Sequence, residues 1–427
     1  MAPGDSNFDI AVVGAGAAGL AAARTAVDAG LRVVVLEAGN RIGGRAFTES
    51  RSLGVPFDHG CRWFHSASLN PFVDIARRLG FDPVPEDRGR YIRVAADGQG
   101  RWTSATEFEK WAAYAQESFA RIEAAGRAER DVAATAVVDA SSSWAPLFDA
   151  WVAMVTAVNL DAVSTVDHAR YVETNENWIV REGYGAVVAA FGAHMPITLG
   201  APVTRIEWKG PDVRLETPCG TARARAAIVT VSTPALAKTI RFDPPLPAWK
   251  QAAIAAVPLG AANKIAFSLR RDVFGRSDEA FSVFSSTSAD AVNFHIRPFG
   301  APVAVGYVGG RMADALEAAG VDAAAAHALD CMKDLFGNDI AREIAATSVS
   351  AWRGDPYIGG AYSAALPGEA ARRGDLGTSL ADRLFFAGEA THLEFYSTAH
   401  GAYLSGVAAA QDARAVLESS AASVGRS

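Results

Sequence analysis

The sequence predicts an α/β protein with a discontinuous Rossmann-type domain and a second, α+β domain that has a mixed sheet and helices. Two apolar strands flank a glycine-rich turn and a helix over residues 10–36, as in a doubly wound parallel sheet. Residues 104–165 show helical spacing, with Ser104 and Glu107 as a capping box at the start. Residues 201–232 alternate apolar and polar side chains, which predicts a β-meander.

The composition excludes some classes of protein. The chain has 427 residues, of which 50% are hydrophobic and 20% are charged, so it can bury a sizeable core. A formal net charge of −7 and a pI of about 5.7 argue against a nucleic-acid-binding surface and are compatible with cationic ligands. No uninterrupted apolar run reaches the roughly 18 residues of a membrane span, so we expect no membrane partner.

Cysteine use predicts a reducing compartment. The three cysteines, Cys61, Cys219 and Cys331, are scattered and show neither a disulfide framework nor metal-ligand spacing. Residues 1–7 are short and polar and lack a signal-peptide pattern. We therefore expect a cytoplasmic protein without a metal, and a homodimer is compatible with the sequence.

The N-terminal unit carries a dinucleotide-binding pattern. Its first strand leads into G-x-G-x-x-G, formed by Gly14, Gly16 and Gly19. These glycines allow a tight turn, close approach of a pyrophosphate and close packing of helix on strand, while the helix N-terminus offers N–H groups to phosphates. Glu37 ends the second strand about 20 residues later, where an acid accepts hydrogen bonds from ribose hydroxyls. An acid at this position disfavours NADP.

A second glycine-rich loop helps to choose between dinucleotides. Gly43, Gly44 and Arg45 follow the second strand closely. Backbone N–H groups of the two glycines can approach an anion, and the arginine can clamp a phosphate. This additional clamp favours a long, permanently held dinucleotide, FAD, over NAD; the alternative for this segment is a polar loop with a surface arginine.

These motifs, in this order, resemble the flavin-containing amine oxidases: monoamine oxidases, polyamine oxidases, L-amino-acid oxidases and lysine-specific histone demethylases. The resemblance spans nearly the whole chain, and GEATH followed by YSTAHGAYLSG is most similar to polyamine oxidases. It implies an FAD-binding domain over residues 1–85, 195–262 and 370–427, and a substrate-binding domain over residues 86–194 and 263–369. Gly39 is a departure, because many members have an arginine there.

The same resemblance implies which residues lie along the cofactor. In the segment FDHGCRWFH, the residues passing the flavin would be Gly60, Cys61, Arg62 and Trp63. His65 matches an active-site position that is often histidine in animal-type polyamine oxidases. Val203, in the segment PVTRIE, would contact the adenine side through its backbone.

Further matches concern the reacting end of the flavin. Lys264 would be held through a water to flavin N5, where an ammonium can stabilise developing negative charge; the alternative is a sheet-edge lysine that prevents aggregation. Trp352 and Tyr362 would line the flavin, with Tyr362 as one wall of an aromatic passage. Ala361 stands where some monoamine oxidases have a cysteine bonded to the flavin, so we expect non-covalent FAD.

The C-terminal segment would complete the cofactor site. Residues 385–387 are expected to form the last strand, with Gly388 and Glu389 closing it beside the ribityl and pyrophosphate groups. Thr398 matches the second tyrosine of the monoamine oxidase passage. Together with Ala399 it would begin a helix whose N-terminus faces the flavin pyrimidine edge and stabilises an anionic reduced flavin.

The expected function is FAD-dependent oxidation of an amine, with hydride transfer from the α-carbon to flavin N5 and reoxidation by O₂ to hydrogen peroxide. A polyamine or another primary or secondary amine is the favoured substrate. An L-amino-acid oxidase is an alternative that needs an arginine clamp, for which Arg62, Arg181 and Arg353 are candidates.

Two other classes share part of the pattern. A carotenoid-desaturase- or protoporphyrinogen-oxidase-like enzyme has a similar front motif, but Lys264 and the pair His65 and Thr398 argue against it. A non-catalytic flavoprotein scaffold would leave Lys264, Tyr362 and Trp352 without a role. Flavin bleaching by an amine without oxygen separates the enzymes from the scaffold.

Overall fold

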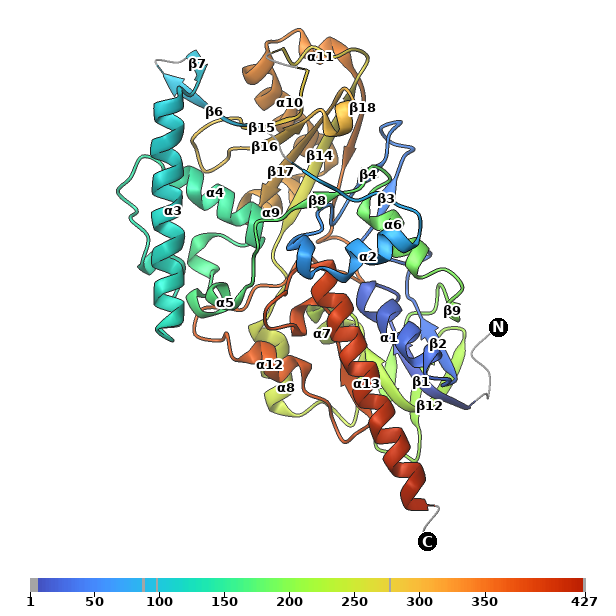
Figure 1. Ribbon diagram of the computed structural model, residues 1–427. Helices are drawn as coiled ribbons and strands as arrows, with labels where there is room; N and C mark the ends of the chain where they lie inside the picture. The colour runs from blue at the N-terminus through green and yellow to red at the C-terminus, as the bar shows by residue number, and fades with distance from the viewer. Residues whose placement is uncertain (1–6, 87–88, 97–98, 276–277, 425–427) are drawn as a thin grey trace.

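The computed structural model describes residues 7–86, 89–96, 99–275 and 278–424 and confirms the predicted α/β fold class. Two large sheets lie in different halves of the molecule (Figure 1), and the chain passes between these halves several times. Residues 1–6, most of the segment without a signal-peptide pattern, lie outside the described residues.

The first sheet is parallel at its centre. β1 (Asn7–Val13) pairs with β2 (Val33–Leu36) on one side and with β12 (Gly220–Val229) on the other. β9 (Ile197–Thr198) extends it beyond β2, and β19 (Leu384–Phe386) pairs in parallel with the end of β12. The predicted meander is confirmed. β10 (Arg205–Glu207) pairs antiparallel with β11 (Val213–Thr217), and β11 pairs antiparallel with the first part of β12. β13 (Arg241–Asp243) pairs with β10.

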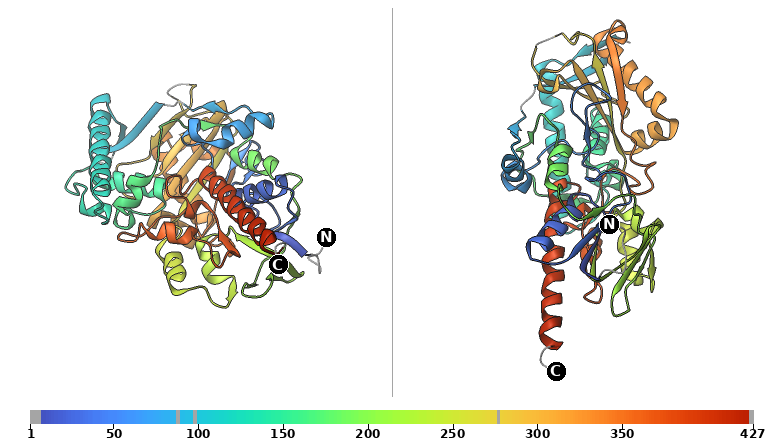
Figure 2. Two further views of the ribbon diagram at one scale, coloured as in Figure 1. Left: turned by 60° about the horizontal axis from the view of Figure 1, so that its bottom comes forward. Right: turned by 90° about the vertical axis from the view of Figure 1, so that its right-hand side faces the viewer.

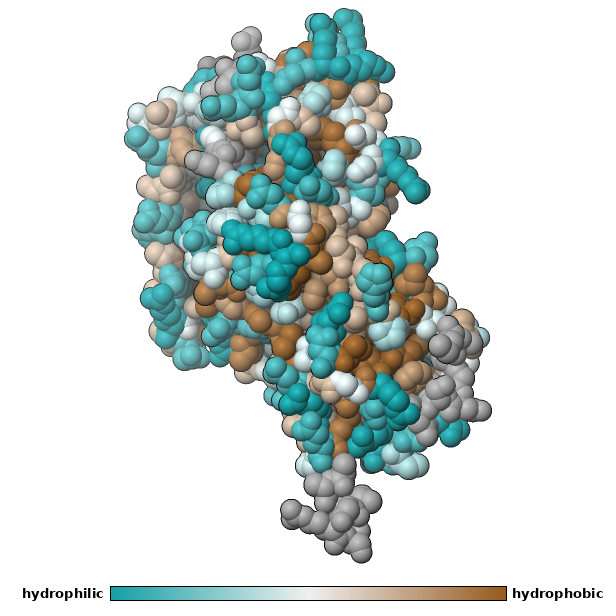
Figure 3. Space-filling model, turned by 45° about the vertical axis from the view of Figure 1, so that its right-hand side comes forward, coloured by the Kyte–Doolittle hydropathy of each residue, from teal (hydrophilic) through white to brown (hydrophobic). Residues whose placement is uncertain are grey.

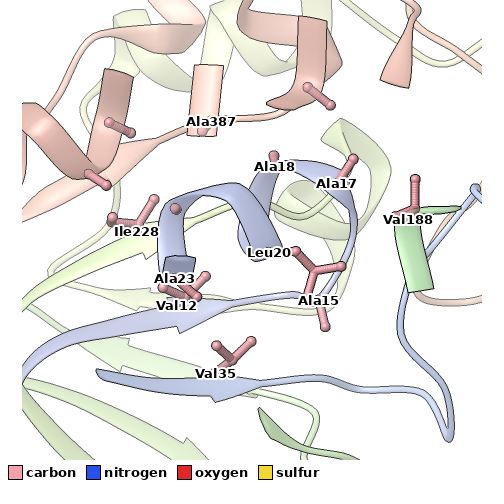
Figure 4. Close-up of a cluster of buried hydrophobic side chains, with 14 of the residues drawn as sticks. Val12, Ala15, Ala17, Ala18, Leu20, Ala23, Val35, Val188, Ile228 and Ala387 are labelled. Carbon is pink, nitrogen blue, oxygen red and sulfur yellow. The ribbon is translucent and has the colours of Figure 1, made fainter. Parts of the chain in front are cut away.

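Helices cover both faces of this sheet. On one face, α1 (Ala17–Asp28) packs against α13 (Ala399–Val424), whose C-terminal end projects beyond the sheet (Figures 1 and 2). Figure 4 shows the core beneath α1, where Leu20, Val12, Val35 and Ile228 meet. The opposite face is covered by α7 (Thr233–Lys238), α8 (Ala248–Ala256) and α12 (Arg372–Gly377).

Small residues let α1 and α13 approach closely. A Cβ on Gly406 would lie 2.1 Å from the carbonyl oxygen of Ala18, so only glycine fits there. Part of the small-residue pattern of α13 therefore serves packing between two helices.

The second sheet is mixed and has the order β18-β14-β17-β16-β15-β6-β7. Its strands are β6 (Gly89–Ala96), β7 (Gln99–Trp102), β14 (Ala262–Leu269), β15 (Phe281–Phe284), β16 (Asn293–Ile296), β17 (Val303–Gly309) and β18 (Ile344–Val349). One face is covered by α9 (Gly310–Ala319) and α10 (Val321–Phe336), which α11 (Ile340–Glu343) follows.

The predicted helical region is confirmed over residues 104–165 and continues slightly beyond. It contains α3 (Ala105–Arg127), α4 (Ala145–Thr156) and α5 (Thr165–Arg170). The capping box is present: Ser104 Oγ accepts from Glu107 N at 3.3 Å, and Glu107 Oε2 accepts from Ser104 N at 2.9 Å.

Short elements complete the fold between the two sheets. They are the pairs β3 (Thr48–Glu49) with β4 (Phe57–Asp58) and β5 (Val84–Pro85) with β8 (Trp178–Ile179), and the helices α2 (Pro71–Arg78) and α6 (Tyr184–Phe191). Hydrophilic and hydrophobic residues are interspersed over the face shown in Figure 3. Among the helices that the structure describes, none combines the length and the apolar character that crossing a membrane requires.

Candidate active site

The predicted cofactor residues meet at one edge of the first sheet. The carboxyl ends of β1, β2, β12 and β19 lie at this edge, because all four strands are parallel. Gly14 follows β1, Glu37 follows β2, and Gly388 and Glu389 follow β19. A cleft at this edge is lined by residues 229–233, 386–391 and Arg45. In open α/β sheets, ligands bind in this position.

The glycine-rich turn has the geometry that a pyrophosphate needs. A Cβ on Gly19 would lie 1.9 Å from the carbonyl oxygen of Gly14, so the helix can approach the strand only with glycine there. A Cβ on Gly16 would meet no atom within 4 Å, so the backbone of the turn faces open space. A phosphate group can therefore approach the N–H groups at the start of α1, which fits a dinucleotide.

Glu37 anchors the backbone around the end of β2. Its Oε2 accepts from Ala15 N at 2.6 Å and its Oε1 from Gly39 N at 2.7 Å, and each oxygen keeps a lone pair for a ribose hydroxyl. The main chain continues the site, because Ala201 N donates to Glu37 O at 2.8 Å. Val203, just before β10, is buried in the same hydrophobic cluster as Ala201.

The second glycine loop joins the two ends of the chain. Gly43 N donates to Ala15 O at 2.8 Å, which places the loop beside the first turn. Arg45 Nη1 donates to Glu389 Oε1 at 2.7 Å and to Ala361 O at 2.6 Å. Arg45 is thus part of a C-terminal ion pair as well as a lining residue of the cleft. Glu389 is buried, which favours its neutral form, yet Arg45 and Ser363 hold its pKa below the ordinary value.

Lys264 reaches from the second sheet to the loop beside the cleft. Its Nζ donates to Asp58 O at 2.7 Å and to Gly60 O at 2.6 Å, and burial lowers its pKa to about 8. β14 pairs with β17 and β18, so Lys264 is not on an edge strand and the aggregation-preventing alternative is excluded. At Gly60 a Cβ would lie 1.7 Å from Arg45 O, which requires glycine.

Tyr307 lies near this lysine, and Trp352 contacts the loop that holds it. Trp352 is buried and its Nε1 donates to His59 O at 3.3 Å, beside Gly60. Tyr362 donates its hydroxyl to Met154 O at the end of α4. Sequence analysis missed Tyr307, whose ring centroid is 5.4 Å from Lys264 Nζ. The cross-strand pairing of Lys264 with Tyr307 places them together, and a single sequence does not show this register.

His65 is half-buried near Trp63, with their ring centroids 5.8 Å apart. Its Nδ1 donates to Asn177 Oδ1 at 2.5 Å, because an amide oxygen can only accept. Burial lowers the pKa of His65, so the ring is neutral at pH 7 with Nε2 as an acceptor. Asn70 Nδ2 links the segment to α13, donating to His65 O at 3.1 Å and to His400 Nδ1 at 3.3 Å.

The other residues of this segment are held by a carboxylate that the sequence analysis missed. Glu86 accepts from Arg62 Nη2 at 3.0 Å and from Trp63 Nε1 at 2.5 Å. Cys61 is half-buried, and desolvation raises the pKa of its thiol to about 12 and keeps it protonated.

Thr398 caps α13. Its Oγ1 accepts from Gly401 N at 3.0 Å and donates to Phe395 O at 2.6 Å, and Ala399 begins the helix. Gly388 N donates to Ser405 Oγ at 3.0 Å, so the same helix holds the turn after β19. In the part of the chain that the structure describes, no cluster of three His, Cys, Asp or Glu side chains could hold a metal ion.

The chain matches one family over most of its length. The family model "Flavin containing amine oxidoreductase" matches residues 17–414. Polyamine oxidase 3 of Oryza sativa subsp. japonica is 31% identical over 94% of this chain and 88% of its own length. Polyamine oxidase 4 of the same plant is 29% identical over 95% and 88%. Human lysine-specific histone demethylase 2 is 25% identical over 94% of this chain and 53% of its own.

Solved structures share the fold. Putrescine oxidase bound to putrescine superposes with a TM-score of 0.81 at 20% identity, covering 96% of this chain and 99% of that one. Cyclohexylamine oxidase from Brevibacterium oxydans IH-35A superposes with a TM-score of 0.75 at 20% identity, covering 97% of this chain and 99% of that one. With its Rossmann-type sheet, glycine-rich turns and matched motifs, this chain belongs to the flavin-containing amine oxidoreductases and is an FAD-dependent enzyme that acts on amines.

Proposed function

We propose that the enzyme oxidises a polyamine or another primary or secondary amine and releases hydrogen peroxide. Bound FAD would supply the redox chemistry, which is removal of a hydride from the carbon next to the amine nitrogen, with O₂ as the final oxidant. The imine product then hydrolyses to a carbonyl compound and an amine or ammonia. The observation that carries the proposal is Lys264, held by Asp58 O and Gly60 O beside the cleft.

The residues at the cleft support FAD held without a covalent bond. Ala361 has no nucleophile, and its carbonyl oxygen accepts from Arg45. The nearby thiol of Cys61 is kept protonated by burial and is a poor nucleophile. Gly14, Gly16 and Glu37 would hold the adenosine and pyrophosphate.

Lys264 would stabilise negative charge that develops at the reacting end of the cofactor. Its ammonium has three N–H groups, and two of them donate to Asp58 O and Gly60 O. The third can donate to a water or to the ligand. Trp352 and Tyr362 would exclude water and orient the flat ring, and the N–H groups at the start of α13, capped by Thr398, would favour negative charge.

His65 would bind the substrate nitrogen. Its Nδ1 proton is held by Asn177 Oδ1, so Nε2 is available to accept an N–H of the amine. A neutral imidazole favours the unprotonated amine, whose lone pair assists hydride departure. No separate general base is needed for this step.

The placement of the arginines favours an amine over an amino acid. Arg62 is paired with Glu86, and Arg353 Nε donates to Asp314 Oδ1 at 2.9 Å. Arg181 is exposed and lies over the Phe299 ring at 4.9 Å. None of these three arginines therefore presents a bidentate fork to the cleft, whereas an L-amino-acid oxidase needs such a fork to bind the carboxylate of its substrate.

The three free cysteines fit a reducing compartment such as the cytoplasm.

A peroxide-coupled screen tests the proposal. The purified protein should be yellow and should release peroxide in air with spermidine, spermine, putrescine or phenylethylamine. Anaerobic addition of the active amine should bleach the flavin, which separates the enzyme from a scaffold. Peroxide only from L-amino acids would overturn the substrate assignment, and bleaching without peroxide in air would make the enzyme a dehydrogenase.

A further inference from the structure

Arg373 on α12 is buried, with 1% of its surface exposed. Its Nε donates to Asp167 Oδ1 at 2.8 Å and its Nη2 to Asp167 Oδ2 at 2.6 Å, a bidentate pair. Asp167 lies on α5, in the helical region that packs on α3. The pair therefore ties the helical region to α12, which covers the first sheet.

Hydrogen bonds continue from this pair to the cofactor cleft. Arg373 Nη1 donates to Ser363 Oγ at 2.8 Å, and Ser363 Oγ donates to Glu389 Oε2 at 2.6 Å. Glu389 Oε1 in turn accepts from Arg45 Nη1 at 2.7 Å. Asp167, Arg373, Glu389 and Arg45 thus alternate in sign along one buried network that ends in the cleft lining.

The charge of Arg373 matters for the state of Glu389. Burial favours the neutral form of this carboxyl, but Arg45, Ser363 and Arg373 lower its pKa. As a carboxylate, Glu389 also accepts from Ser397 N at 2.9 Å, which fixes the loop before α13. Loss of Arg373 would leave Glu389 with one positive neighbour and Ser363 Oγ without the donor that fixes its orientation. The positions of Glu389 and Arg45 in the cleft would then be less well fixed.

We infer that Arg373 is a positioning residue for FAD: anchored by Asp167 of the helical region, it orients Ser363, Glu389 and Arg45, so that FAD affinity depends on the seating of α5. Arg373 itself does not line the cleft. The inference rests on the assignment of this cleft to FAD made above.

A purely structural role for the buried pair predicts a different result. A structural pair lowers the unfolding temperature when it is broken, and FAD leaves only as the chain unfolds. A positioning role weakens FAD binding in protein that is still folded. Heating the holoprotein while recording released-flavin fluorescence and far-UV circular dichroism separates the two, because a positioning role lets flavin leave before the helices melt.

The test uses the full-length protein and three variants. Removing one partner of a buried ion pair can prevent folding, whereas replacing both partners by apolar residues is often neutral for stability. The main variant is therefore the double substitution Asp167→Leu with Arg373→Met, and Arg373→Lys keeps the charge but loses the bidentate geometry. The matched control is the double substitution Asp272→Leu with Arg297→Met, because Arg297 is 3% exposed and makes a similar bidentate pair with Asp272 beside the second sheet.

Apoprotein of each variant is titrated with FAD, and the dissociation constant is taken from flavin fluorescence quenching. We expect the Asp167 and Arg373 double variant to bind FAD at least tenfold more weakly, Arg373→Lys to be intermediate, and the Asp272 and Arg297 control to stay within twofold of the wild type. An Asp167 and Arg373 double variant that binds FAD within twofold of the wild type overturns the inference. If the double variant does not fold, Arg373→Lys decides by the same criterion.

Glu389→Gln distinguishes failure of this inference from failure of the cleft assignment. If the cleft holds FAD, Glu389→Gln weakens FAD binding. Combining it with the double variant should then raise the FAD dissociation constant by less than the product of the two separate fold-changes. Unchanged FAD affinity in Glu389→Gln means that the cleft assignment is wrong. Weak binding in Glu389→Gln with normal binding in the Arg373 variants means that only the coupling is wrong.

Discussion

Two buried lysines make nearly the same contacts in different regions. Lys264 Nζ donates to two backbone carbonyls, and Lys250 Nζ donates to three, those of Asp375, Leu376 and Thr378. Burial lowers the pKa of both, to about 8 for Lys264 and about 7 for Lys250. A lowered pKa therefore does not separate a candidate catalytic lysine from a structural one.

The difference lies in the remaining N–H and in its location. Lys250 uses all three ammonium N–H groups on carbonyls around the end of α12, as expected for a cation at a helix C-terminus. Lys264 uses two, both on the loop that passes the cleft, and among the described residues its third N–H has no hydrogen-bond acceptor. A lysine N–H group without an acceptor beside the cleft is therefore a better sign of function than a lowered pKa.

Lys264→Met should give the largest effect and tests this comparison directly. We expect amine turnover per bound FAD to fall by about 10²-fold, because the electrostatic donor at the reacting end is lost. FAD should remain bound, since Lys264 holds neither the glycine-rich turn nor Glu37. Stopped-flow bleaching and peroxide release measure the two half-reactions. Unchanged turnover would refute the role of Lys264.

Lys250→Met should affect stability instead. The substitution leaves three carbonyl oxygens near α12 without their donor, so we expect the free energy of unfolding to fall by about 2 kcal/mol. Urea denaturation of the holoprotein measures it. Turnover per bound FAD should stay within twofold of the wild type. A loss of turnover as large as that of Lys264→Met would erase the distinction between the two lysines.

The pH dependence of turnover sharpens the role of the third N–H. Above about pH 8, Lys264 loses a proton and keeps only two N–H groups, which its two carbonyls occupy. We expect kcat of the wild type to fall about tenfold as the pH rises past about 8, because deprotonation weakens the electrostatic donor but does not remove it. Lys264→Met should lack this alkaline limb, and Lys250→Met should keep it. The same limb in Lys264→Met would assign it to another group.

Sequence patterns were a better guide to the residues at the edge of the first sheet than to Lys264 and its neighbours. Gly14, Glu37 and Glu389 each follow a strand end, so the rule for parallel sheets was enough to bring them to one edge. Lys264 needed a family resemblance, because an isolated lysine in a strand has no local signal.

Partners that come from distant elements could not be predicted. Tyr307 meets Lys264 through strand register, Glu86 meets Arg62 from beyond α2, and Arg373 meets Asp167 from another helix. Charged residues of this kind are usually solvated, and burial becomes visible only when the layers are assembled.

Lys250 should also affect the pH dependence of stability. The pKa of Lys250 is about 7 in the folded state and near the ordinary 10.5 in the unfolded chain. Between these values the unfolded chain binds more protons, so this lysine makes the free energy of unfolding rise with pH, by up to about 1.4 kcal/mol per pH unit. Lys250→Met should remove that contribution, and urea denaturation from pH 7.5 to 9.5 should show a flatter profile than the wild type. Parallel profiles would mean that Lys250 stays charged in the fold, held by Asp375 and the carbonyls of α12.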